Sequence, residues 1–144
     1  MNDDLQEILD LSPDDRTELS ERVGAIERLL RARYGDVALS RSSAYLPLLQ
    51  QLIDERAISP NEADALQSLG LAFGEVLVHE LGLRWVIVKD RYGRDPALRL
   101  GDTSMLLFPK TLLSKRLEAG QPTDVASMLE SLQAHLRGLT GGGS

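Results

Sequence analysis

The two histidines are the first residues to consider for chemistry, because an imidazole can bind a metal or move a proton near neutral pH. Neither His79 nor His135 has a second histidine or a carboxylate at a metal-ligand spacing such as His-Glu-x-x-His. Glu80 follows His79 directly, but adjacent residues on a helix do not face each other. We therefore interpret both histidines as structural or solvated and predict no metal site and no cofactor.

The motifs of nucleophilic catalysis and of phosphate loops are also missing. The chain has no cysteine, which excludes disulfides, zinc-thiolate sites and cysteine nucleophiles. It has no Gly-x-Ser-x-Gly elbow, and the glycines at 141–143 follow no predicted strand, so they form no phosphate loop. The sequence predicts a protein without catalytic residues. An enzyme that uses some of the scattered carboxylates stays open as an alternative.

The segment 90–95 is the most distinctive candidate for a binding site. It combines two arginines, a tyrosine and two aspartates in a turn that we expect to be exposed. Arginine and tyrosine are favoured at protein interfaces, although a solvated turn with local ion pairs is the simpler interpretation. The predicted partner-binding residues here are Asp90, Arg91, Tyr92, Arg94 and Asp95.

A second candidate is the acidic start of the chain. The whole net charge of −6 lies in residues 1–20, because the acidic and basic residues after them are equal in number. An acidic arm can steer a basic partner onto a complementary surface, although a charge run is usually a solvated face. The acidity argues against binding to nucleic acid. The predicted partner-binding residues here are Asp3, Asp4, Glu7, Asp10, Asp14 and Asp15.

The third candidate is an anion site. A helix is predicted to begin at Pro109, and backbone N–H groups at a helix start can hold a phosphate. Lys110, Thr111, Lys115 and Arg116 would provide this site in a small-molecule or nucleotide-binding regulatory module. The alternative is an ordinary solvated helix start.

Helices are predicted to dominate the first half of the chain. Residues 2–11 are expected to form a short helix, and Ser12 and Pro13 to start a second one that ends at Gly35. A loop at 36–42 leads to a helix over 43–56. A capping box from Ser59 to Glu62 predicts the start of a long helix that ends at Gly82.

The pattern then changes to that of strands. Segments 83–90, 97–100 and 104–108 predict a three-stranded antiparallel meander, in which Trp85 is a core residue. Two C-terminal helices follow, one from Pro109 to Gly120 and one after Thr123. Gly70 and Gly74 lie four apart in the long helix, which indicates close approach by another backbone, expected to be the strand segment.

The predicted fold class is therefore α+β, with N-terminal helices, one long helix, the sheet and two closing helices. We expect a single domain over 1–138, with a helical part at 1–58 and a core at 59–138. The residues 139–144 are expected to form a flexible tail of linker-like composition.

Residues 59–137 resemble an uncharacterised bacterial family, a domain of unknown function. The resemblance implies a shared fold rather than shared chemistry, because the matching residues are mostly glycine, proline and tryptophan. They are Leu69, Gly70, Gly74, Gly82, Trp85, Asp90, Gly93, Pro96, Pro109, Lys115, Arg116 and Gly120.

Small acidic bacterial proteins without an active site are often dedicated inhibitors. Our leading hypothesis is a non-enzymatic, protein-binding immunity protein that covers the active site of a cognate toxin with a basic surface. No apolar run is long enough for a membrane span, and the acidic start differs from a signal peptide, so we expect a cytoplasmic protein that binds no membrane.

Overall fold

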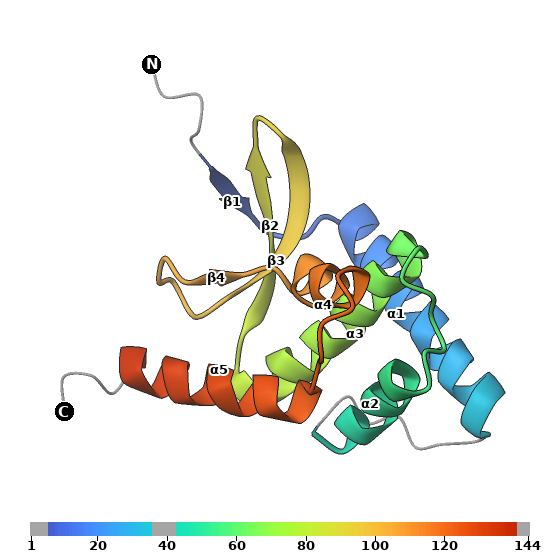
Figure 1. Ribbon diagram of the computed structural model, residues 1–144. Coiled ribbons are helices and arrows are strands. Elements are labelled where there is room, and N and C mark those ends of the chain that lie inside the picture. The colour runs from blue at the N-terminus through green and yellow to red at the C-terminus, as the bar shows by residue number, and fades with distance from the viewer. Residues whose placement is uncertain (1–5, 36–42, 141–144) are drawn as a thin grey trace.

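The computed structural model describes residues 6–35 and 43–140, and it confirms an α+β fold. The predicted loop at 36–42 lies outside the described residues. Figure 1 shows the sheet on one side of the molecule and the helices α1 to α4 packed together on the other. The elements are β1 (Glu7–Leu9), α1 (Pro13–Tyr34), a 3-10 turn (Ser43–Tyr45), α2 (Leu46–Asp54), α3 (Ala63–Leu81), β2 (Arg84–Asp90), β3 (Gly93–Arg99), β4 (Leu106–Leu107), α4 (Pro109–Glu118) and α5 (Val125–Thr140).

The sheet differs from the prediction in its number of strands. It has four antiparallel strands in the order β1-β2-β3-β4, and the segment expected to be a helix at 2–11 contributes β1. In β1, Ile8 lies opposite Val88 and Leu9 opposite Ile87. A helix as short as 2–11 is marginal in water, whereas the strand pairs with residues 87–89 of β2 and places one apolar side chain on each face.

The start of α1 is as predicted. The Ser12 hydroxyl accepts a hydrogen bond from the Asp15 backbone N–H at 3.1 Å, and the Asp15 carboxylate accepts one from the Ser12 N–H at 2.9 Å. Pro13 occupies the first helical position, and the helix ends before Gly35, whose φ is 81°. The Ser12 capping box therefore fixes where α1 begins.

The predicted start of α3 was wrong. The Glu62 carboxylate accepts from the Ser59 N–H at 2.9 Å, as a capping box requires, but Ser59 bonds to Asn61 and the helix begins only at Ala63. These contacts close a turn in front of the helix instead of capping it. The predicted end is confirmed, since Gly82 adopts φ 66° at the C-cap.

The helix α3 forms the centre of the core. Phe73, Val76 and Leu77 are fully buried on it, and α4 crosses it closely. A Cβ atom on Gly70 would overlap the carbonyl oxygen of Pro109, and one on Gly74 would lie 2.6 Å from Cη2 of Trp85. The close approach expected at these glycines therefore comes from the start of α4 as well as from β2.

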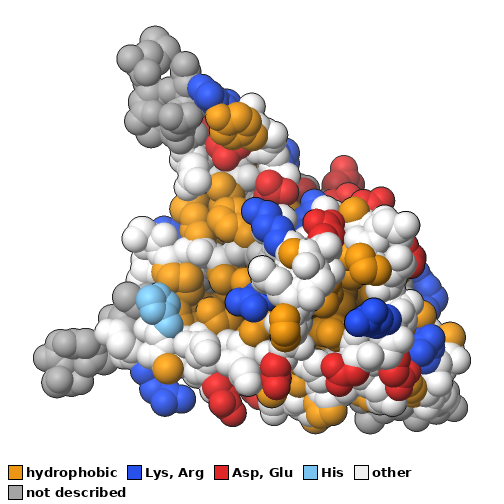
Figure 2. Space-filling view, in the orientation of Figure 1, with side chains coloured by type: hydrophobic (Ala, Val, Ile, Leu, Met, Phe, Trp, Pro, Cys, Tyr) orange, Lys and Arg blue, Asp and Glu red, His pale blue; other side chains and the backbone are white. Residues whose placement is uncertain are grey.

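The two faces of the sheet have different environments. Trp85 packs toward α3, whereas Val86, Val88 and Ala97 form a second buried cluster on the opposite face. Figure 2 shows hydrophobic side chains over the sheet and between the sheet and α5, while most charged side chains lie around them. The sheet therefore carries buried apolar side chains on both faces.

Candidate functional site

The structure brings two of the predicted binding segments together. Asp15, in the first turn of α1, forms an ion pair of 2.8 Å with Arg94 of the β2–β3 hairpin. The next residue along the hairpin, Asp95, lies 3.8 Å from Lys110 at the start of α4. We call residues 90–95 together with Asp15 and Lys110 the hairpin site. Its two ion pairs anchor the hairpin to both neighbouring helices.

The tip of the hairpin is held by local contacts. The Asp90 carboxylate accepts from the Tyr92 N–H at 2.8 Å, which closes the turn. The Arg91 guanidinium donates to the Tyr92 hydroxyl at 2.8 Å and lies 4.9 Å from the centre of its ring. Tyr92 is 79% exposed and is the large hydrophobic residue that stands out at the surface. Figure 2 shows basic, hydrophobic and acidic side chains together at this tip.

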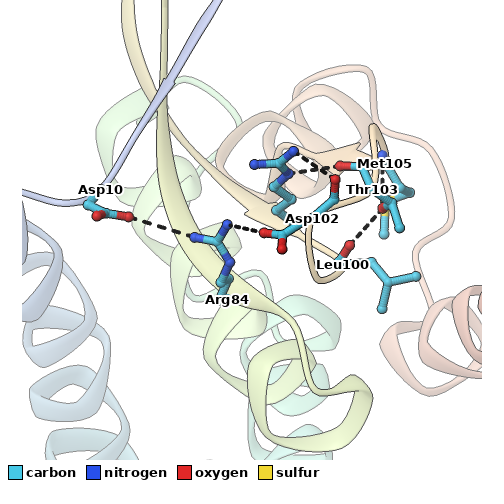
Figure 3. A network of polar contacts seen from close by, with 7 residues as sticks. Asp10, Arg84, Leu100, Asp102, Thr103 and Met105 are labelled. Carbon is cyan, nitrogen blue, oxygen red and sulfur yellow. Dashed lines mark hydrogen bonds and ion pairs between the residues drawn. The ribbon is translucent and has the colours of Figure 1, made fainter.

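The remaining acidic residues are distributed more widely. Asp10 pairs with Arg84 at 3.8 Å, and Arg84 also contacts Asp102 at 3.4 Å, in the network drawn in Figure 3. Both carboxylates are more than 90% exposed, so these pairs contribute little to stability. Glu7 lies opposite Lys89 in the sheet, and Asp14 is exposed on α1. Asp3 and Asp4 lie outside the described residues.

The four residues of the predicted anion site do not converge. Lys110 pairs with Asp95, and the Thr111 hydroxyl donates to the Phe108 carbonyl at 3.4 Å. Lys115 and Arg116 are exposed in the last turn of α4, where Arg116 lines a separate groove against α5. The structure therefore places Lys110 in the hairpin site, beside Asp95.

The described residues contain no group of three or more histidine, aspartate or glutamate side chains that could hold a metal ion. In the same part of the chain, no helix is long and apolar enough to cross a membrane.

The pKa of Asp15 lies below its usual range. The hydrogen bond from the Ser12 backbone N–H is the main cause; partial burial opposes it, and the Ser12 hydroxyl and the Arg94 charge add to it. A carboxyl group with a lowered pKa in the folded state binds its proton less readily than in the unfolded chain. Its contribution to stability is present above about pH 4 and disappears as the pH falls through the lowered value.

We expect Asp15→Asn to lower the free energy of unfolding at pH 7, and this effect to shrink as the pH falls below the usual aspartate pKa of 3.8. Urea denaturation of both proteins across this range measures the difference. Asp14→Asn is the matched control, because Asp14 is exposed and makes no side-chain hydrogen bond or ion pair within the described residues. An Asp15→Asn effect that is constant with pH would contradict a role for the ionised carboxylate.

The sequence alone indicates Asp15 and Arg94 as two separate candidates. It does not show that they pair, because they are 79 residues apart. It also missed a contact between the ends of two helices, in which Glu55 accepts from Arg33 at 2.8 Å and from the Tyr34 hydroxyl at 2.9 Å. Only the packing of α1 and of α2 on α3 brings these residues together.

Comparison with known structures supports the fold. A crystal structure from Bacteroides thetaiotaomicron VPI-5482, at 1.50 Å resolution, superposes with a TM-score of 0.83 at 20% sequence identity. The match covers 93% of this chain and 49% of that one, so this chain spans about half the length of its structural relative. No curated protein matches the sequence.

Comparison with family models gives a match over residues 46–129, from the start of α2 to the beginning of α5. The model is described as a domain of unknown function, DUF3806. It confirms the resemblance inferred from residues 59–137 and moves its start back to α2. The match covers more than half of the chain, which therefore belongs to the DUF3806 family.

Proposed function

We propose that this domain is a non-enzymatic protein-binding module whose contact surface is the hairpin site. The observation that carries the proposal is the exposed Tyr92 ring, held in place by Arg91 and by the closed turn at Asp90. An aromatic anchor that is already ordered loses little conformational entropy on binding. Tyrosine and arginine also dominate the binding energy of many interfaces.

The hairpin site itself has as many basic as acidic side chains, so the charge that favours a basic partner comes from the neighbouring start of α1. Asp14, Asp15 and Glu18 lie in the first turns of α1, next to the hairpin that Arg94 ties to it. A partner with a basic rim around a pocket for an aromatic ring would fit this surface. In its most specific form, the proposal is an immunity protein that acts in the bacterial cytoplasm and covers the active site of a toxin.

We expect Tyr92→Ala to weaken binding to the partner by about thirtyfold or more, the effect of losing a hot spot of about 2 kcal/mol. The melting temperature should not change, because the ring is mostly exposed. The partner is sought by co-purification from the native host and among the products of adjacent genes. Binding is then measured by calorimetry.

Arg137→Ala is the matched control, since Arg137 is exposed at the far end of α5.

Charge reversal at Asp14 should lower the association rate, and added salt should reduce that effect. Absence of any protein partner would remove the proposal. A partner whose affinity is unaffected by Tyr92→Ala and by charge reversal at Asp14 would show that it binds elsewhere.

A further inference from the structure

A pocket of about 420 Å³ shares no lining residue with the hairpin site. It is bounded by the end of α2, the connection to α3, and the loop between α4 and α5. Its walls are mainly apolar and include Ile53, Ile58, Leu69 and Leu117. Its volume is within the range of about 300–1,000 Å³ that is typical of sites for small organic ligands.

Arg56 lines this pocket and has an unusual backbone conformation. Its φ is 52°, and it is the non-glycine residue with positive φ among those described. Its N–H donates to the Ile53 carbonyl at 3.1 Å, and the Ala57 N–H donates to the Leu52 carbonyl at 3.0 Å. This is the Schellman arrangement at a helix end, in which glycine is strongly favoured at the position of Arg56. The arginine is therefore present although glycine would be more stable.

The polar groups around the pocket differ in their hydrogen bonding: some have partners within the described residues, and one does not. Asp54 accepts a hydrogen bond of 2.9 Å from Gln50, whose amide also binds the Thr123 carbonyl and the Val125 N–H at 2.9 Å each. Gln50 thus fixes the loop that forms one wall. The Arg56 guanidinium makes no hydrogen bond or ion pair within the described residues and remains available as a cation at the rim.

We infer that this pocket binds a small amphipathic carboxylic acid. Its apolar body would lie against the leucine and isoleucine walls, and its carboxylate would accept hydrogen bonds from Arg56. Guanidinium and carboxylate match in geometry and charge, which gives a reason for an arginine at a position where glycine is preferred. This site is separate from the hairpin site and does not depend on a protein partner.

The test uses decanoate as the probe, with decanol as its neutral counterpart. Binding is measured by calorimetry, and amide shifts in NMR spectra locate the site. We expect decanoate to bind the wild type, with shifts around Ile53, Ile58 and Leu117, and decanol to bind more weakly. Arg56→Gly should weaken decanoate binding about ten- to a hundredfold. Arg116→Ala, an exposed arginine outside this pocket, should leave binding unchanged.

Arg56→Gly should also raise the melting temperature by about 3 °C, because glycine adopts this conformation without strain. Loss of binding in a more stable protein separates a ligand role from damage to the fold. The inference is overturned if decanoate fails to bind the wild type, or if it binds Arg56→Gly equally well. It is also overturned if a peptide with a C-terminal leucine binds at Arg56 and decanoate does not.

Discussion

Gly70→Ala is expected to destabilise the fold by about 3 kcal/mol, as a small-to-large change in a packed core that cannot relax. The added Cβ would overlap the carbonyl oxygen of Pro109 and also approach that of Lys110. These are backbone atoms in the first turn of α4, so no side-chain rotation can relieve the contact. The whole start of α4 would have to move away from α3. Urea denaturation monitored by circular dichroism measures the change.

Gly24→Ala is the matched control, because Gly24 also lies inside a helix. Its Cβ would meet only the end of the Arg28 side chain, at 3.5 Å. Alanine is more stable than glycine in a helix interior by about 1 kcal/mol, so this variant should be stabilised. If both variants were stabilised, α4 would not pack on α3 as closely as the structure shows.

Gly74→Ala is expected to cost about 2 kcal/mol for a related reason. Its Cβ would lie 2.6 Å from Cη2 and 2.9 Å from Cζ2 of Trp85, and 3.1 Å from Cβ of Pro109. Here the main obstacle is a side chain, and phenylalanine lacks both indole atoms. Trp85→Phe should therefore recover part of the loss caused by Gly74→Ala.

A double-mutant cycle on Gly74 and Trp85 tests this coupling. We expect an interaction energy of about 1 kcal/mol, which is within the range for residues in direct contact. Gly70→Ala combined with Trp85→Phe provides the control, because the obstacle at Gly70 is the backbone of α4. Strictly additive effects at positions 74 and 85 would contradict the observed contact.

Local signals in the sequence predicted the elements that depend on local contacts. The capping box at Ser12 fixes the start of α1, and Gly82 fixes the end of α3. The short segment at β1 was predicted as a helix, because its apolar residues suit either structure and only pairing with Val88 and Ile87 decides between them. Ser59 and Glu62 interact as predicted, but their interaction closes a turn.

The candidate sites follow the same distinction. The exposed tip at Arg91 and Tyr92 could be predicted, since a hairpin turn exposes its central residues. Its connection to Asp15 could not, because it depends on how α1 packs beside the sheet. Arg56 was missed for another reason: its residue type disfavours the conformation that it adopts.

The strand β1 has a consequence for how the family region behaves by itself. The match to the family begins at residue 46, yet β1, which covers one side of β2, lies before it. Without β1, Ile87, Val88 and Lys89 of β2 would present an open strand edge to other chains. The three residues of β1 thus shield this part of the β2 edge from pairing with other chains. During synthesis they emerge before β2 and are available as soon as it forms.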